Sequence, residues 1–363
     1  MMIKNSEEKI DFILQALALA EKRRGFCSPN PAVGALVVKD KNIIGRGIHW
    51  ACGKPHAEVM ALEEAGENAK GCELYVTLEP CCHFGRTPPC VNLIIKKGIR
   101  QVYYAMTDPN PKVLGKSFQL LNEAKVKIDF ITVPQVVSFY ESYSYWWQTA
   151  KPFVTFKLAL SLDGKIASKG KKRLQLTGVA CQKLTHEWRR KSDALLTTAK
   201  TVLSDDPELN VRLDDEVISK KVYVLDRQLE LSTSIKLLRT SAKLILLYDE
   251  AISSPKIATW NNLGVECHPM PLSTPGELSW DAILKFIGEQ GVHDLWVEAG
   301  SHCFQTLWQK RLINQLLLYL APQVVGSNGL SAFSPDLQFC LSNDKNLIWQ
   351  QYGPDVVLSW KKK

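Results

Sequence analysis

The chain has 363 residues, of which 45% are hydrophobic and 23% are charged. This composition is ordinary for a globular protein and excludes the collagen-like and intrinsically disordered classes, while the length favours two domains of roughly 100 to 200 residues each. The net charge of +8 is modest and spread along the chain, so it fits anionic small-molecule ligands better than nucleic acid, which usually needs a stronger, clustered basic surface.

The first predicted element is an amphipathic helix over 7–24, capped by Ser6, in which Ile13 and Leu17 stand at helical spacing. Its apolar part follows acidic residues and runs into a basic segment, so it does not have the pattern of a secretory signal. No apolar run approaches the roughly 18 residues of a membrane span. We therefore expect a cytoplasmic protein without a membrane segment, whose cysteines outside any metal site are reduced.

Strands and helices then alternate through the first half of the chain, which is typical of a layered α/β sheet. Further helices are predicted over 56–65, 88–97 and 116–123. Strands are predicted over 33–38, 43–48, 73–77, 101–105 and 126–131.

Six aromatic residues lie between positions 138 and 152, and a new strand begins after Lys151-Pro152. We interpret these aromatic residues as core or interdomain packing. The predicted domains are therefore 1–147 and 148–363.

The second half alternates again and is predicted to be another α/β domain. Strands are predicted over 153–160, 193–196, 221–225, 243–247, 293–298 and 314–320, and helices over 179–190, 280–290 and 302–310. No Gly-x-Gly-x-x-Gly follows the first of these strands, so a standard Rossmann fingerprint is absent.

The motif richest in chemistry is His56-Ala57-Glu58 followed by Pro80-Cys81 and, later, Cys90. A catalytic zinc site keeps three protein ligands and one water, and zinc nucleobase deaminases carry H-x-E followed by P-C-x-x-C. Here Phe84 stands where the second Cys of that signature belongs, and Cys90 is the next usable thiol. The pattern predicts a hydrolytic zinc site whose parts lie at helix N-termini, where thiolates and carboxylates are favoured.

A closed zinc site that only stabilises the fold is the alternative interpretation of this cluster. In that case Cys82 or His83 would be the fourth ligand. A structural site has no use for a proton-shuttling Glu58 beside its His, which favours the catalytic interpretation.

The run Pro-Cys-x-His-x-Gly-Arg-Thr-Pro-Pro-Cys over 80–90 resembles the pyrimidine deaminase half of the bifunctional riboflavin biosynthesis deaminase-reductase family. The likeness extends through 30–34, 45–49 and 108–111 and covers about residues 10 to 145. It implies a cytidine-deaminase-like α/β/α layer domain with Zn²⁺. The implied zinc ligands are His56, Cys81 and Cys90, and the implied catalytic residue is Glu58. The implied substrate contacts are Asn30, His49, His83, Arg86, Asp108 and Asn110, of which Arg86 suits a phosphate.

Segments 157–164, 201–212 and 297–301 resemble the reductase half of the same family, which implies a dihydrofolate-reductase-like α/β domain that uses NADPH. The implied cofactor contacts are Ala159, Gln175, Thr201, Asp205, Gly300, Ser301, His302, Cys303, Phe304, Gln305 and Thr306. The implied substrate contacts are Arg173, Arg189, Leu209, Arg212 and Glu298. Arginine can bind a phosphate through two hydrogen bonds, although an isolated helical Arg such as Arg189 is more often a surface ion-pair residue.

One segment departs from the family pattern, because Arg173-Leu174-Gln175-Leu176-Thr177 stands where the family has Ser-x-Trp-Ile-Thr. The missing Trp removes a stacking surface, and Arg173 is either a substitute phosphate ligand or part of a solvated loop.

The resemblance implies deamination of a phosphorylated pyrimidine and then reduction of its ribosyl group, in a homo-oligomer. A nucleic-acid base deaminase is a rival, but the basic stripe with stacking aromatics that it would need is absent from the sequence. A binding protein with a structural zinc and an NADPH-sensing half is the second rival, and release of ammonia would separate it from an enzyme.

Overall fold

The computed structural model describes residues 2–84, 88–168, 174–253, 255–335, 337, 341 and 346–362. Two of the predicted substrate contacts, Arg86 and Arg173, lie outside these residues. The chain divides into two compact units, Met1–Ala150 and Lys151–Lys363. Within the described ranges, no helix combines the length and apolar character that crossing a membrane requires.

The first unit is built on a five-stranded sheet in the order β2-β1-β3-β4-β5. Strand β1 is antiparallel to β2 and β3, whereas β3, β4 and β5 are parallel. The strands are β1 (Gly34–Lys39), β2 (Asn42–Ile48), β3 (Glu73–Val76), β4 (Gln101–Tyr104) and β5 (Lys127–Phe130). The helices are α1 (Met2–Glu21), α2 (Ala57–Ala65), η1 (Gly66–Ala69), α3 (Cys90–Lys96), α4 (Lys116–Glu123), α5 (Pro134–Phe139) and α6 (Glu141–Thr149).

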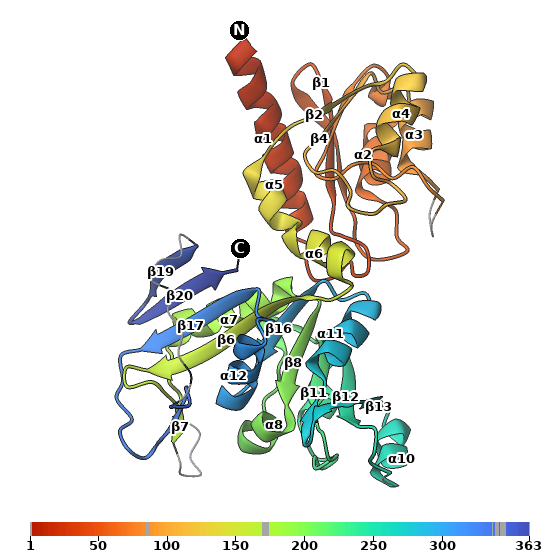
Figure 1. The fold of residues 1–363 in the computed structure, drawn as a ribbon. Coiled ribbons are helices and arrows are strands. Elements are labelled where there is room, and N and C mark those ends of the chain that lie inside the picture. The colour runs from red at the N-terminus through yellow and green to blue at the C-terminus, as the bar shows by residue number, and fades with distance from the viewer. Residues whose placement is uncertain are drawn as a thin grey trace. The chain divides into compact units, whose positions relative to one another are not determined.

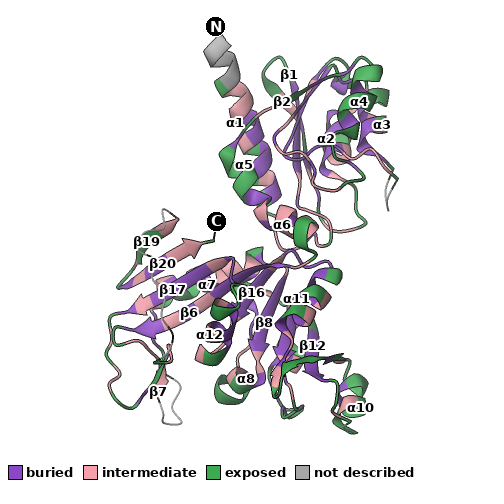
Figure 2. Ribbon diagram, viewed as in Figure 1, coloured by how far each residue is buried: buried purple, intermediate pink, exposed green. Residues whose placement is uncertain are grey.

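Helices cover both faces of this sheet (Figure 1). Alternate residues of the strands point to opposite faces, so Leu36 packs in a core with α1 and α5, while its neighbour Val37 packs in a second core with α2 and α3. Figure 2 shows the buried strands between half-exposed helices. The α/β/α layering predicted for this half is confirmed.

Helix α2 packs unusually close to β2 because two positions of that strand are glycine. A Cβ on Gly47 would lie 1.8 Å from the Ala57 carbonyl oxygen, and one on Gly45 would lie 2.1 Å from the Ala61 carbonyl oxygen. The strand thereby fixes the N-terminus of α2, where the metal-site motif begins.

Three predicted helices of the first unit begin at other residues in the structure. Helix α1 starts at Met2 and ends at Glu21, so the predicted cap at Ser6 lies inside it. His56 is the extended residue before α2 and does not belong to its first turn. Helix α3 begins at Cys90, because Pro89 has the extended backbone of a flanking residue (φ −58°, ψ 131°).

The second unit is built on a nine-stranded sheet in the order β13-β12-β11-β8-β16-β6-β17-β20-β19. The pairs from β13 to β17 are parallel, and β20 and β19 continue the sheet antiparallel. Its strands are β6 (Phe153–Ser161), β8 (Ala194–Thr198), β11 (Lys221–Leu225), β12 (Lys243–Asp249), β13 (Glu266–Met270), β16 (Asp294–Glu298), β17 (Gln315–Ala321), β19 (Leu347–Tyr352) and β20 (Asp355–Lys361).

Helices again cover both faces of the large sheet. One core includes residues of α11 and α12, and the other includes residues of α7, α8, α9 and α10. The helices are α7 (Val179–Lys191), α8 (Ala199–Asp205), α9 (Leu237–Thr240), α10 (Pro255–Asn262), α11 (Trp280–Glu289) and α12 (Ser301–Gln309). Three small antiparallel pairs complete the unit: β7 (Lys165–Ser168) with β18 (Gly329–Ser331), β9 (Val211–Leu213) with β10 (Glu216–Ile218), and β14 (Leu272–Thr274) with β15 (Glu277–Leu278). The α/β class predicted for this half is confirmed.

The carboxyl ends of β8, β16 and β6 meet at one edge of this sheet, because the three strands are parallel neighbours. Their register pairs Glu298 with Lys157 and Val297 with Leu196. Residues that follow these strands are therefore adjacent in space, as the ligand sites of open α/β sheets require.

Candidate functional site

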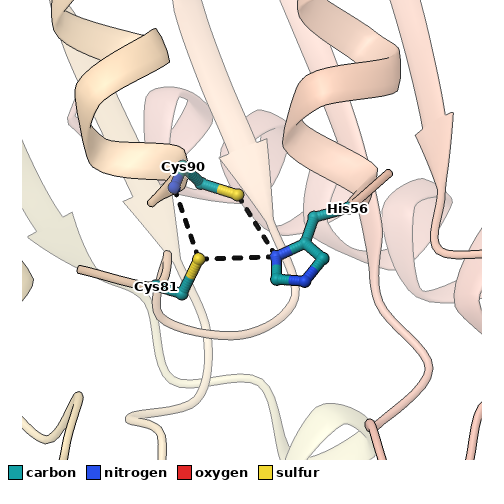
Figure 3. Close-up of side chains that lie close together, drawn as sticks. All are labelled: His56, Cys81 and Cys90. Carbon is teal, nitrogen blue, oxygen red and sulfur yellow. Dashed lines mark hydrogen bonds between the residues drawn. The ribbon is translucent and has the colours of Figure 1, made fainter. Parts of the chain in front are cut away.

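Three side chains from separate segments of the first unit converge on one point (Figure 3). His56 precedes α2, Cys81 lies in the segment after β3, and Cys90 begins α3. The Nδ1 atom of His56 is 3.4 Å from Cys81 Sγ and 3.3 Å from Cys90 Sγ. The three donor atoms all lie within 4.8 Å of one another.

These separations fit a zinc ion. Zinc bonds sulfur at about 2.3 Å and nitrogen at about 2.0 Å, so two donors at tetrahedral corners are about 3.5 Å apart. In the described part of the chain, no fourth His, Cys, Asp or Glu joins the group. The Cys82 thiol instead donates to the Lys112 carbonyl at 3.6 Å. The described geometry therefore favours an open site over the closed alternative.

The donors differ in charge. A hydrogen bond from the Cys90 thiol, together with His56, lowers the pKa of Cys81 to about 4, although burial opposes the shift. The main-chain N–H of Cys90, at the start of α3, donates to the same sulfur at 3.3 Å. The hydrogen bond to Cys81 raises the pKa of His56 to about 9. Cys81 is thus the thiolate of the pair.

Glu58 lies in the first turn of α2, two residues from His56, and is only 4% exposed. Burial, with the negative charge on Cys81, raises its pKa to about 7. A carboxyl group with this pKa can both take and return a proton near neutral pH. Glu58 is not one of the three grouped donors.

A cavity of about 230 Å³ adjoins these residues. His56, Glu58 and Cys81 line it, and so do five of the six predicted substrate contacts. Those five are Asn30, His49, His83, Asp108 and Asn110.

The two histidines His49 and His83 of the cavity differ in the hydrogen bonds that their ring nitrogens make. His49 is 2% exposed and burial lowers its pKa, so the ring is neutral. Its two nitrogens lie 3.1 Å from the Pro55 carbonyl and 3.2 Å from the Asn30 amide, which is a donor, so Nδ1 carries the proton. The Nδ1 atom of His83 is enclosed and has no hydrogen-bond partner among the described residues.

The cavity lining also includes Glu79 and Tyr143, neither of which is a predicted site residue. Glu79 Oε2 accepts hydrogen bonds from the main-chain N–H groups of Asp108 and Gly115, at 3.3 and 3.2 Å. The Tyr143 hydroxyl donates to Asp108 Oδ1 at 3.2 Å. Tyr143 belongs to the aromatic group interpreted as packing, and nothing in its sequence neighbourhood marks a contact with a residue 35 positions earlier.

In the second unit, several predicted cofactor contacts meet at the carboxyl edge of β8, β16 and β6. Ala159 lies near the end of β6, Thr201 lies in the first turn of α8 after β8, and Gly300 immediately precedes α12 after β16. Gly300 has φ −77°, which any residue adopts, and in the described part of the chain a Cβ there would meet no atom within 4 Å. This open space at the positive end of a helix fits a phosphate of a dinucleotide.

The other predicted cofactor residues differ in how they could contribute. Cys303, Phe304 and Thr306 are buried, and the Phe304 ring packs 5.4 Å from that of Phe156, so this part of α12 faces the core. Asp205 and Gln175 are exposed, and Gln175 donates to the Thr177 carbonyl. The remaining predicted contacts are Ser301, His302 and Gln305, all in α12 and outside the core.

Two of the predicted substrate contacts of this unit, Arg189 and Glu298, form a buried ion pair. Arg189 donates to both carboxylate oxygens of Glu298, at 2.6 and 3.0 Å. Although burial opposes ionisation, Arg189 lowers the pKa of Glu298 to about 2. Leu209 is buried, and Arg212 is exposed and paired with Glu208. Arg189 is therefore paired with a protein carboxylate, but it is buried and does not lie at the surface as the ion-pair interpretation expects.

Lys157 lies next to the Arg189–Glu298 ion pair, although the sequence did not predict it as a site residue. It lies opposite Glu298 in the sheet register, contributes to the low pKa of Glu298, and places its Nζ 5.3 Å from the centre of the Tyr319 ring. It stands inside the motif at 157–164, but only the sheet register reveals its position beside Glu298.

Comparison with known proteins accounts for both units. The family described as "Cytidine and deoxycytidylate deaminase zinc-binding region" matches residues 6–106, and the RibD C-terminal domain family matches residues 152–358. The riboflavin biosynthesis protein RibD of Haemophilus influenzae is 36% identical, with both chains covered over 100% of their lengths.

Solved structures agree with these matches. Acinetobacter baumannii RibD superposes with a TM-score of 0.87 at 31% identity, with 99% of each chain covered. A diaminohydroxyphosphoribosylaminopyrimidine deaminase/5-amino-6-(5-phosphoribosylamino)uracil reductase from Thermotoga maritima superposes with a TM-score of 0.84 at 30% identity, covering 99% of this chain and 100% of that one.

These matches assign zinc to the first unit and NADPH to the second. Because the relatives align along their whole length and both domain families fall in the units that carry the corresponding chemistry, this chain belongs to the RibD family of bifunctional riboflavin biosynthesis enzymes, which join a deaminase to a reductase.

Proposed function

We propose that the first unit hydrolytically deaminates 2,5-diamino-6-(5-phosphoribosylamino)pyrimidin-4-one, and that the second unit reduces the ribosyl group of the product to a ribityl group with NADPH. The main evidence for this proposal is that His56, Cys81 and Cys90 come together next to the cavity that Glu58 lines. The Thermotoga maritima relative is named for the same pair of activities.

In this proposal His56, Cys81 and Cys90 hold the zinc ion. When bound, the ion would act as a Lewis acid that lowers the pKa of a water molecule to near neutral pH. A carboxylate oxygen of Glu58 takes a proton from the attacking water. The same carboxyl group then gives a proton to the departing amine, so that the ring carbon exchanges its amine for oxygen and ammonia leaves. Burial raises the pKa of Glu58, which favours return of the proton to the amine.

The polar groups of the cavity are proposed to recognise the substrate. His83 offers a buried nitrogen, and Asp108 offers a carboxylate. Asn30, His49 and Asn110 complete the proposed set, and Arg86 is proposed for the phosphate by resemblance alone.

In the second unit, Gly300 and the start of α12 are proposed to bind the phosphates of NADPH, which when bound supplies hydride to the sugar carbon. Ala159, Thr201, Asp205 and Gln175 remain proposed cofactor contacts, together with residues 301–306. Glu298, Arg189, Leu209, Arg212 and Arg173 remain proposed for the substrate. The ion pair with Arg189 keeps Glu298 anionic at neutral pH.

The direct test uses the purified, zinc-loaded chain and the diaminopyrimidinone substrate. Ammonia release without NADPH, followed by NADPH oxidation when that cofactor is added, is the expected result. Absence of ammonia release from zinc-loaded protein would overturn the deaminase assignment and favour a binding role.

A second test addresses the NADPH site. Gly300→Ala fits the backbone and meets no atom of the described residues, so the fold should be unchanged, while the added methyl group takes space that the cofactor needs. We expect the KM for NADPH to rise about tenfold, equal to about 1.4 kcal/mol. An unchanged KM for NADPH would remove Gly300 from the site.

We also propose a homo-oligomer located in the cytoplasm that binds no nucleic acid. Among the described residues, nine cysteines form no disulfide bond, which supports a reducing compartment. The modest net charge argues against nucleic acid as a partner. Light scattering of the purified chain tests the oligomer, and a single species of monomer mass would refute it.

A further inference from the structure

Asp108 lies between β4 and α4 and is held from several directions. Its main-chain N–H donates to the side chain of Glu79 in the segment after β3, and its Oδ1 accepts the main-chain N–H of Asn110 at 2.9 Å. The same Oδ1 accepts the Tyr143 hydroxyl at 3.2 Å. The first two contacts fix the loop, and the third reaches the carboxylate from a different element, α6.

These hydrogen bonds divide the two oxygens of the Asp108 carboxylate. Both of the observed bonds go to Oδ1. The other oxygen, Oδ2, accepts no hydrogen bond among the described residues and is not one of their enclosed, unpartnered polar atoms. Since Asp108 lines the cavity, Oδ2 is the oxygen that a ligand can reach.

Tyr143 is well placed to keep that orientation. The residue is 6% exposed, and the centre of its ring lies 6.3 Å from that of Trp146 and 6.5 Å from that of Tyr140. A side chain packed in this way loses little further freedom when its hydroxyl holds a neighbour. Tyr143 also lines the cavity, so its hydroxyl lies at the boundary between core and site.

We propose that Tyr143 is a positioning residue of the deaminase site: it holds Asp108 Oδ1 so that Oδ2 accepts a hydrogen bond from an N–H or O–H group of the substrate. The inference rests on the proposed function of the first unit and deepens it. It assigns a role to an aromatic side chain of α6 that the motifs of the chain do not indicate.

Tyr143→Phe in the full zinc-loaded chain is the test, because it removes the hydroxyl and keeps the packed ring. The KM for deamination should rise about tenfold, the size expected when a substrate loses a well-oriented hydrogen bond to a charged group. The kcat, the zinc content and the NADPH oxidation with deaminated product should stay within twofold of wild type.

Tyr140→Phe is the matched control. Tyr140 is a neighbouring buried tyrosine whose hydroxyl contacts Thr77 Oγ1 at 2.6 Å and the Ala32 carbonyl at 2.9 Å, and the residue is not part of the cavity lining. Its loss should lower the unfolding temperature and leave the KM unchanged. An equal rise of KM in both variants would mean a structural role and overturn the inference.

Asp108→Asn supplies the second measurement, and it also serves if Tyr143→Phe folds poorly. Asp108→Asn alone should raise the KM for deamination at least as much as Tyr143→Phe. The double variant should raise the KM little further, because both substitutions disrupt the same series of contacts from Tyr143 through Asp108 to the substrate. Fully additive effects, or an unchanged KM in Asp108→Asn, would refute the inference. A wild-type chain that releases no ammonia would instead refute the function on which it rests.

Discussion

Glu58 and the three metal donors share one small volume, yet their protonation is controlled by different neighbours. Burial acts on Glu58, whereas hydrogen bonds between the donors act on Cys81 and His56. The carboxyl group can therefore titrate near neutral pH while the sulfur remains charged.

Glu58→Gln should abolish deamination and leave both zinc content and NADPH oxidation intact, because the amide keeps the shape of the side chain but cannot carry the proton. Ammonia release and metal content measured on the same sample check this. Retained deamination, or loss of zinc, would show that Glu58 has another role.

Cys81→Ser and Cys90→Ser should each lose zinc, because both sulfurs face Nδ1 of His56. Cys82→Ser should retain it, since that thiol donates to the Lys112 carbonyl outside the group. Metal analysis after dialysis makes the comparison. Equal loss in all three variants would indicate a closed structural site, contrary to the open geometry.

The sequence predicted the site residues that belong to motifs, but not those whose role depends on tertiary contacts. His56, Cys81 and Cys90 were predicted because their residue types and spacing are rare by chance, and the structure brings them together. Glu79 and Tyr143 were missed because each acts on a loop that is remote in sequence, and buried Glu and Tyr side chains have common structural roles.

At the scale of elements, the strongly periodic segments were predicted to within a few residues, and α4 and β11 had the predicted limits. Short elements such as α8 and the pairs of two- and three-residue strands were missed, because they are fixed by caps and neighbours more than by periodicity. Thr198 illustrates this, since its hydroxyl accepts the Thr201 N–H and so starts α8.

Gly47→Ala should disturb the metal site through packing alone. The new methyl group would overlap the Ala57 carbonyl and push α2 away from β2, which costs about 1–3 kcal/mol as overpacking. Because His56 and Glu58 stand at that end of α2, zinc affinity should fall with stability. Urea unfolding and zinc titration measure the two effects.

Gly34→Ala is the matched control, since a Cβ there would overlap Ala16 of α1 on the opposite face of the sheet. It should lose comparable stability while zinc affinity stays near that of wild type. Unchanged zinc affinity in Gly47→Ala would mean that the position of α2 does not limit metal binding.

At the scale of the whole molecule, each compact unit has its own cores. The two clusters of the first unit contain no residue beyond Trp147, and those of the second contain none before Val154. The predicted boundary after residue 147 falls inside α6, which ends at Thr149, so a cut at residue 150 keeps that helix whole.

A fragment of residues 151–363 should therefore fold alone and oxidise NADPH when given the deaminated product. All proposed cofactor and substrate contacts of the reductase lie within it. Circular dichroism and absorbance at the NADPH band check folding and activity. A fragment that folds but does not react would show that the reductase needs residues of the first unit.

The short distances among His56, Cys81 and Cys90 also make the site sensitive to oxidation once its metal is removed. The two sulfurs lie within 4.8 Å, and a low-pKa thiolate is the form of cysteine that oxidants attack. A chelator used in air should convert Cys81 and Cys90 to a disulfide, as two electrons and two protons pass to the oxidant. Deamination should then return only when a thiol reductant accompanies the zinc, while NADPH oxidation continues throughout. Recovery with zinc alone would show that the sulfurs stay apart without the ion.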